Sequence, residues 1–140
     1  MTQQQKQQGP SQSRTLHSTS VLNPYPRGAY VFVQEALGYT VGKLHGDPRK
    51  VDPAKRHISG RQLCHGLRDY AITKYGLLAR SVLQHWNIHR TDDFGRIVYA
   101  LIESGQLSCS EEDRIEDFAS VYSFDEAFDH QQILQSIMRN

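Results

Sequence analysis

Histidine and cysteine side chains that could coordinate a metal ion lie in the middle of the chain. His85 and His89 are four residues apart, a spacing that can present two imidazoles to zinc from one face of a helix. Three further candidate ligands precede them: His57, Cys64 and His65. Asn87 is expected to end a helix between the two histidines, and no second ligand pair has metal-site spacing. We therefore expect surface and helix-end histidines, with neither a metal ion nor another cofactor.

Carboxylates that could serve as general acid and base lie in the last third of the chain. One pair is Asp92 with Asp93, and a second group comprises Glu111, Glu112, Asp113, Glu116 and Asp117. A catalytic carboxylate must be buried or crowded enough for its pKa to rise. Neighbouring carboxylates at a helix start or in a polar turn are expected to stay solvated, and the acidic turn lacks the alternating ligands and central glycine of a calcium loop. Acid–base catalysis is therefore not predicted.

Nucleophile and phosphate-binding motifs are also missing from the sequence. There is no Gly-x-Ser-x-Gly and no glycine-rich loop ending in Gly-Lys-Ser/Thr. Cys64 stands beside His65, but neighbouring residues of a helix point about 100° apart, so the two are not expected to form a dyad. Cys64 and Cys109 provide neither a disulfide framework nor a Cys-x-x-Cys motif, which favours a reducing compartment. The sequence predicts a protein that is not an enzyme.

Charge is distributed very unevenly along the chain. Residues 1–90 contain thirteen Lys and Arg against four Asp and Glu (13 − 4 = +9), and residues 91–140 contain three against eleven (3 − 11 = −8). The formal net charge of +1 therefore conceals a strong dipole. Such asymmetry favours a partner with its own electric field, or two faces that attract one another.

Two sets of charged residues are the candidate binding surfaces. The basic set, expected on a loop and the helix after it, comprises Lys43, Arg49, Lys50, Lys55, Arg56, Arg61 and Arg68. The acidic set comprises Glu111, Glu112, Asp113, Glu116 and Asp117. The basic set is suited to an acidic protein or to nucleic-acid phosphates, and the acidic set to a basic partner.

These surfaces lead to two hypotheses about function. The first is a non-catalytic protein-interaction or adaptor module whose protein partner is unknown. Self-association, in which the basic half of one molecule meets the acidic half of the next, is an extension of it. The alternative is a nucleic-acid-binding or ribosome-associated protein that contacts the RNA or DNA backbone through the basic loop and the helix after it.

The elements that must position these residues are mainly helical. Over residues 26–44, apolar residues recur at spacings of three and four, which predicts a helix with Pro26 in its first turn. Its expected inward-facing residues are Tyr30, Val33, Leu37, Val41 and Leu44. Residues 45–56 contain two prolines and no periodicity, which predicts an exposed loop. Ser59 followed by Gln62 fits a capping box that opens a second helix, and Gly76 would end that helix.

Two more helices follow in the predicted order. The third covers residues 77–86, has Leu78 on its inner side and Trp86 in the core, and is closed by Asn87 in a left-handed conformation. The fourth is capped by Thr91, begins with two carboxylates that favour the helix dipole, and ends at Gly105.

The remainder of the chain is less regular. Apolar and polar residues alternate over short stretches on both sides of a polar turn, which indicates a small β-hairpin over residues 106–118. A helix over residues 111–119 is the alternative. Ser123 is expected to cap a last helix. Its predicted inner residues are Phe124, Phe128, Leu134, Ile137 and Met138. The predicted fold is a mainly α (α+β) domain of about five helices that is winged-helix-like, with an all-α bundle as the alternative.

The sequence also predicts the domain organisation. A disordered polar tail is expected over residues 1–20, followed by one globular helical domain over residues 21–140. The tail lacks the apolar core of a secretory signal, and the longest apolar run, residues 97–102, is far shorter than the roughly 20 residues of a membrane-spanning helix. We therefore expect a cytoplasmic protein without membrane contact.

Five sequence blocks can be compared with known domains. They are Tyr30-Val31-Phe32-Val33, His57-Ile58-Ser59-Gly60, Arg68-Asp69-Tyr70-Ala71, Trp86 to Val98, and Glu116-Asp117-Phe118 through Ala127-Phe128. Together they cover most of residues 25–128 and resemble an uncharacterised bacterial repeat-protein family of small domains, some of whose members carry the domain in tandem. The block from Trp86 to Val98 is the most specific. The resemblance implies no activity, cofactor or partner, because that family has none assigned.

Overall fold

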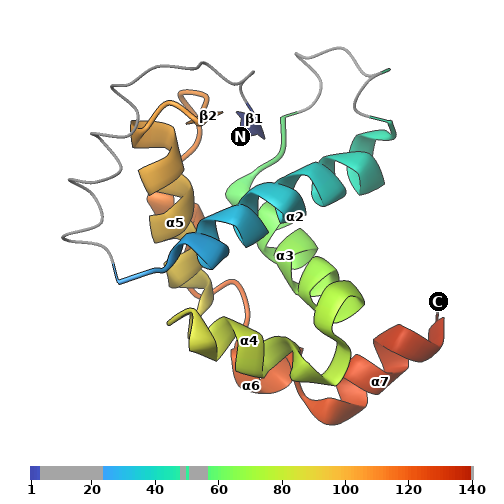
Figure 1. Ribbon diagram of the computed structural model, residues 1–140. Helices are drawn as coiled ribbons and strands as arrows, with labels where there is room; N and C mark the ends of the chain where they lie inside the picture. The colour runs from blue at the N-terminus through green and yellow to red at the C-terminus, as the bar shows by residue number, and fades with distance from the viewer. Residues whose placement is uncertain (4–23, 48–49, 51–56, 140) are drawn as a thin grey trace.

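The computed structural model describes residues 1–3, 24–47, 50 and 57–139 of the 140-residue chain (Figure 1). Its elements are β1 (Thr2–Gln3), α2 (Arg27–His45), α3 (Gly60–Tyr75), the 3₁₀ helix η2 (Gly76–Leu78), α4 (Ala79–His85), α5 (Thr91–Glu103), β2 (Leu107–Ser108), the 3₁₀ helix η3 (Ile115–Phe118), α6 (Phe124–Ala127) and α7 (His130–Arg139). The mainly α class is confirmed. Within the described ranges, no helix combines the length and the apolar character needed to cross a bilayer.

Helices α2 and α3 cross at the centre of the molecule and make its most extensive helix–helix contact (Figure 1). The buried residues of α2 are apolar or small: Ala29, Phe32, Val33, Ala36, Leu37, Thr40 and Val41. Gly66 of α3 allows the close approach, because a Cβ on it would lie only 1.8 Å from Thr40 Oγ1. Tyr30, predicted to face inward, is half-buried. Leu44, with the same prediction, is 47% exposed because the last turn of α2 extends beyond its crossing with α3.

Helix α3 begins and ends where the sequence predicts. Ser59 Oγ accepts a hydrogen bond from the Gln62 N–H at 3.0 Å, and Gln62 Oε1 accepts one from the Ser59 N–H at 2.8 Å. This capping box satisfies two backbone donors that would otherwise lack partners. At the other end Gly76 has φ of 55°, in the left-handed region that favours glycine.

The segment after α3 differs from the predicted single helix, because it consists of η2 followed by α4. Leu78, expected to face inward, is 66% exposed. Trp86 lies half-buried at the edge of the core, with its ring centroid 5.4 Å from that of Phe32. The short 3₁₀ turn offsets α4 from α3, so the apolar stripe of the sequence does not face inward along its whole length. Asn87 has φ of 65°, which confirms the left-handed end of this segment.

Helix α5 starts with buried polar side chains, whereas the sequence predicted solvated ones. Asp93, only 6% exposed, accepts hydrogen bonds from the N–H groups of His89 (2.8 Å) and Arg90 (3.1 Å) and is therefore the side chain that caps the helix. Thr91, predicted as the cap, instead donates its hydroxyl to the Phe118 carbonyl oxygen at 2.6 Å. The predictions of solvated carboxylates and of Thr91 as the cap were both wrong, because η3 packs on the start of α5 and encloses it.

The predicted hairpin over residues 106–118 is wrong, and so is the wing of a winged-helix fold. β2 pairs antiparallel with β1 from the start of the chain. The register places Thr2 opposite Ser108 and Gln3 opposite Leu107. The expected second strand is replaced by η3, whose Phe118 is fully buried against Gly60 and Gly95. The ring is buried between α3 and α5, and this burial stabilises η3 where the sequence predicted a strand.

The first three residues also depart from the prediction of a disordered tail over residues 1–20. Met1 is fully buried, and its ammonium group donates to the Ile58 carbonyl oxygen at 2.6 Å and lies 3.3 Å from Asp113 Oδ2. Burial of the Met1 side chain and pairing of its ammonium group offset the conformational entropy that is lost when this segment becomes ordered. The other residues of the predicted tail, 4–20, lie outside the described residues.

Helices α6 and α7 replace the predicted single C-terminal helix. Ser123 Oγ accepts a hydrogen bond from the backbone N–H two residues further on at 3.2 Å, as expected of its capping role. Helix α6 ends at Ala127, with Phe128 as its C-cap, and α7 starts in a new direction with Ile133 as its buried residue. Three residues predicted to face inward are 45%, 45% and 81% exposed: Leu134, Ile137 and Met138. The break between α6 and α7 explains this error, because it rotates the apolar stripe away from the core.

Candidate functional site

The predicted basic set is only partly gathered by the fold. Arg61 and Arg68 both lie on α3, seven residues apart. Lys43 is exposed at the end of α2, with its Nζ 5.3 Å from the centroid of the Tyr39 ring, and Lys50 is exposed beyond that helix. Three members of the set lie outside the described residues: Arg49, Lys55 and Arg56. The structure therefore supplies a basic surface on α3 and leaves the basic loop untested.

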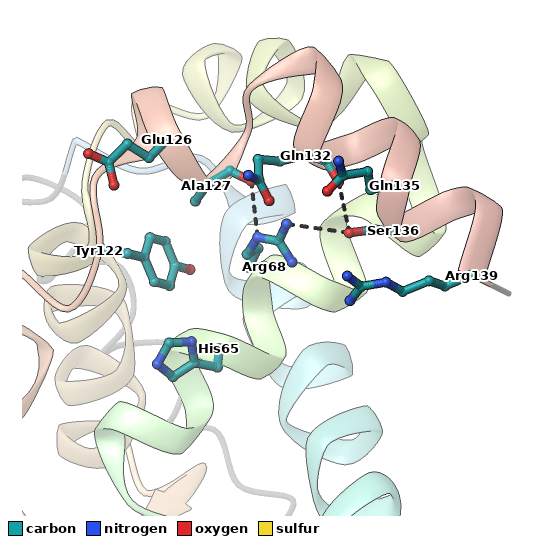
Figure 2. Close-up of a pocket in the computed structure, with 9 residues that line it drawn as sticks. All are labelled: His65, Arg68, Tyr122, Glu126, Ala127, Gln132, Gln135, Ser136 and Arg139. Carbon is teal, nitrogen blue, oxygen red and sulfur yellow. Dashed lines mark hydrogen bonds between the residues drawn. The ribbon is translucent and has the colours of Figure 1, made fainter.

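The exposed side of α3 carries a stripe of three basic or ionisable residues. Arg61, His65 and Arg68 follow one another at helical spacings of four and three, which places them on one face. Arg61 and His65 are exposed, and the Arg68 side chain is 19% exposed. We call these residues the α3 stripe. It leads directly to a cavity between α3 and α7 (Figure 2).

The cavity has a volume of about 420 Å³ and opens to the surface. Its lining combines basic, amide and hydroxyl groups: His65, Arg68, Tyr122, Glu126, Ala127, Gln132, Gln135, Ser136 and Arg139. Figure 2 shows Arg68 projecting from α3 toward α7, with Arg139 beyond it at the end of α7. With His65 taken as neutral, the lining holds two positive charges and one negative charge, or 2 − 1 = +1. We call this site the α3–α7 pocket.

Arg68 is held rigidly at the centre of the pocket. Its Nε donates to the Ala127 carbonyl oxygen at 3.0 Å and its Nη1 to Asp69 Oδ1 at 3.1 Å, while Nη2 lies 3.4 Å from Ser136 Oγ. A guanidinium has five N–H donors, so these contacts leave donors that can reach a ligand. A positioned guanidinium loses little conformational entropy on binding a carboxylate or phosphate, which favours Arg68 as an anion-binding group.

The α7 side of the pocket was missed by the sequence reasoning. Its polar residues recur at helical spacings along one face: Gln132, Gln135, Ser136 and Arg139. The spacing of these polar residues is visible in the sequence. They were not proposed as a site because the prediction for this helix concerned its apolar side. Arg139 is exposed and adds a second guanidinium to that of Arg68.

Tyr122 closes the floor of the pocket. Its ring centroid lies 5.6 Å from that of His65, and its hydroxyl donates to the Cys64 carbonyl oxygen at 2.6 Å. Burial raises the pKa of Tyr122 well above its usual value, so the phenol stays neutral at physiological pH. Tyr122 therefore contributes shape and a ring face, while the charge of the pocket comes from its arginines.

The acidic set is divided between internal and exposed positions. The Asp113 side chain is only 4% exposed, and burial would raise its pKa, but the Ser110 N–H and the Met1 ammonium together lower that pKa. Asp117 Oδ2 accepts the Arg114 N–H at 3.1 Å at the start of η3. The remaining three members are exposed: Glu111, Glu112 and Glu116. Asp113 is thus held inside the fold, Asp117 caps η3 while partly exposed, and the three glutamates can face a basic partner.

The candidate metal ligands stay apart in the described part of the chain, which contains no group of three or more His, Cys, Asp or Glu side chains arranged to hold a metal ion. His85 ends α4, while His89 lies beyond it with Nε2 3.0 Å from Asn87 Oδ1. Cys64 is buried in the core, whereas His65 is exposed in the pocket, as expected for adjacent residues of a helix.

Comparison of the chain with protein-family models, with curated proteins and with solved structures gives no match. The resemblance to a bacterial repeat-protein family, the cytoplasmic location and self-association therefore remain predictions.

Proposed function

We propose that the protein is a non-catalytic interaction module that binds an acidic segment of a protein partner in the α3–α7 pocket. The observation that supports this most directly is the presence of two guanidinium groups at one cavity, Arg68 from α3 and Arg139 from α7 (Figure 2). Arginine binds carboxylates through paired, charge-assisted hydrogen bonds. Arg61, further along the α3 stripe, would contact a second acidic residue of the same segment.

The remaining groups favour recognition over catalysis. Burial raises the pKa of the Cys64 thiol to about 12, so this thiol is not an activated nucleophile. The Tyr122 phenol is likewise kept protonated. The amides of Gln132 and Gln135 can donate to and accept from a peptide backbone, as a peptide-binding pocket requires.

The rim of the pocket favours an acidic protein segment over a nucleic-acid backbone at this site. Glu126 lines the pocket, and its neighbours along the chain Asp125 and Asp129 are exposed, with Asp125 paired with Arg80 at 2.6 Å. A continuous polyanion that passed over these carboxylates would meet repulsion, whereas a peptide can place single carboxylates against Arg68 and Arg139.

A fluorescence-anisotropy titration of a labelled peptide whose glutamates are separated by neutral residues tests this proposal. Charge reversal at an exposed pocket residue, Arg139→Glu, should weaken binding about tenfold or more, since a hydrogen bond to a charged group contributes about 1.5–3 kcal/mol. Arg61→Glu should weaken binding less, because Arg61 lies outside the cavity. Arg114→Glu changes the charge equally at an exposed site near the acidic set and serves as the matched control.

Three results would count against the proposal. The first is equal binding by the Arg139→Glu and Arg114→Glu proteins, which would show that only net charge matters. The second is absence of binding at about 50 mM salt, where attraction between exposed charges is least screened. The third is displacement of the peptide from the pocket by duplex DNA or RNA at lower concentration than unlabelled peptide, which would favour nucleic acid as the ligand of this pocket.

A further inference from the structure

A row of aromatic side chains follows the contact between α2 and α3 and continues to the end of α4. The ring centroids of Tyr39 and Tyr70 are 5.2 Å apart, and Phe32 lies 5.6 Å from Tyr70 and 5.4 Å from Trp86. Tyr75 completes the row at 6.1 Å from Trp86. Phe32 is buried, whereas the other four rings are half-buried and each leaves part of its surface to solvent. We call these five residues the aromatic row.

The row ends in a groove of about 350 Å³. The groove is lined by Arg27, Gly28, Val31, Phe32, Glu35, Lys74, Tyr75 and Trp86. The indole of Trp86 lies against the backbone of Gly28, where a Cβ would be only 2.8 Å from Nε1, so the first turn of α2 sits directly on the indole edge. The result is a depression that combines aromatic and charged side chains and has room for a planar ring.

Cations accompany the aromatic row along its length. Lys43 Nζ lies 5.3 Å from the Tyr39 ring centroid, and Lys74 Nζ lies 5.7 Å from Tyr70 and 5.6 Å from Tyr75. Arg27 is exposed at the groove. Glu35 is the carboxylate that lines the groove, and its Oε1 is 2.8 Å from Lys74 Nζ. Asp69 is a second carboxylate of this surface, since its charge acts on Lys43, so three cations against two carboxylates give a local charge of 3 − 2 = +1.

We propose that the aromatic row and its cations bind single-stranded nucleic acid, with a base stacked on the Trp86 ring in the groove and phosphates on Arg27, Lys43 and Lys74. The plane of the Tyr75 ring is inclined by 76° to that of Trp86, so Tyr75 would bound the base at its edge. Aromatic faces interleaved with cations are the combination that single strands require, because every base has a face to stack and every linkage carries a negative charge. A duplex keeps its bases stacked on one another and cannot place one in the groove. The surface is separate from the α3–α7 pocket, so the inference does not rest on the proposed function.

Trp86 is the only tryptophan in the chain, so its fluorescence reports directly on the groove. Titration with oligo(dT) or oligo(U) should give saturable quenching as a base stacks on the indole. Three phosphate contacts predict a slope of about −2 in the logarithm of affinity against that of salt concentration, or about a 20-fold loss between about 50 and 200 mM salt. Duplex DNA and inorganic polyphosphate should leave the fluorescence of Trp86 unchanged.

Two variants separate stacking from charge. Tyr75→Leu should weaken binding about two- to tenfold with the salt slope unchanged, because it removes the aromatic ring that bounds the base and no cation. Tyr30→Leu, at a half-buried tyrosine of α2 outside the row, is its matched control. Lys43→Ala should reduce the salt slope by about 0.7 with the saturating quench unchanged, and Arg114→Ala should leave the slope unaltered. Thermal melting confirms that each variant is folded.

Several outcomes would overturn the inference. Absence of quenching by oligo(dT) and oligo(U) at about 50 mM salt would exclude a base in the groove. Equal quenching by polyphosphate or by an oligoglutamate peptide would show a site for anions or acidic peptides without base stacking. Equal quenching by a duplex, or equal affinity of the Tyr75→Leu and Tyr30→Leu proteins, would likewise refute it.

Discussion

The crossing of α2 and α3 predicts that adding one methyl group at Gly66 destabilises the protein. In Gly66→Ala the new Cβ would lie 1.8 Å from Thr40 Oγ1 and 2.7 Å from both Thr40 Cβ and Cγ2. Rotation of the Thr40 side chain cannot remove the contact with its Cβ, so the two helices must separate. Overpacking of this kind costs about 1–3 kcal/mol, and the gap opened between the helices adds to it, whereas the better helix propensity of Ala returns about 1 kcal/mol. We expect a net loss of about 2 kcal/mol.

Gly42 in α2 provides a matched comparison, because no atom lies within 4 Å of the Cβ that Gly42→Ala would add. That variant should gain about 0.5–1 kcal/mol from helix propensity. Urea and thermal denaturation followed by circular dichroism measure both changes, and the expected loss for Gly66→Ala corresponds to about 8 °C in Tm. In a Thr40→Gly protein, Gly66→Ala should no longer lower the free energy of unfolding, because the side chain that clashes with the new Cβ is absent. The steric argument would be refuted if Gly66→Ala were as stable as the unsubstituted protein, or if the Thr40→Gly background left its cost unchanged.

Three further predictions concern buried polar groups. Thr91→Val should cost about 1–3 kcal/mol in urea denaturation, because it leaves the Phe118 carbonyl oxygen without its buried donor, whereas Thr73→Val at an exposed site should change little. A thiol reagent at pH 8 should modify exposed Cys109 rapidly and Cys64 only after denaturation, and equal rates would contradict the burial of Cys64. Burial raises the pKa of Tyr25 from 10.0 to about 12, so folding favours its neutral phenol; the associated stability is present below pH 10 and lost as pH rises toward 12. Tyr25→Phe should flatten that part of the decline in Tm, and an unchanged decline would exclude Tyr25 as its source.

Helix positions were predicted most accurately where a local signal marks both ends. The reciprocal hydrogen bonds of Ser59 and Gln62 and the left-handed Gly76 depend on residues within a few positions of one another, so the sequence of α3 defines its own limits. Asn87 closes the segment after it for the same reason. The start of α5 was misassigned because the choice between Thr91 and Asp93 as the cap depends on η3, which encloses Thr91 from elsewhere in the chain.

The errors after residue 105 share one physical cause. A strand is stabilised by the partner that it pairs with, and alternation of residues does not identify that partner. β2 pairs with Thr2 and Gln3 from the other end of the chain, and the segment expected to form its partner becomes η3 so that Phe118 is buried. Likewise the break at Phe128 rotates α7, which exposes the side of that helix predicted to be buried.

Each candidate site likewise combines residues that the sequence identified with residues that only the packing of the helices brought together. Arg61 and Arg68 were recognised from their charge and helical spacing, but Arg139 joins them only because α7 packs beside α3. The aromatic row was not anticipated, because Tyr39, Tyr70 and Trp86 are distant in sequence and become neighbours where α2 crosses α3. Asp113, by contrast, was assigned to a binding surface and serves in an internal contact with the Met1 ammonium group.

By itself, the sequence determined the mainly helical class, the limits of α3, the left-handed residue after α4 and the segregation of charge, because each depends on composition or on residues within a turn of one another. The tertiary structure decided which carboxylates are buried, which strand β2 pairs with, and which basic and aromatic side chains share a surface. These depend on contacts between residues far apart in the chain, and a close approach such as that of Gly66 to Thr40 sets which side chains become neighbours. Local chemistry therefore specified the helices, and their packing specified the surfaces that can bind a partner.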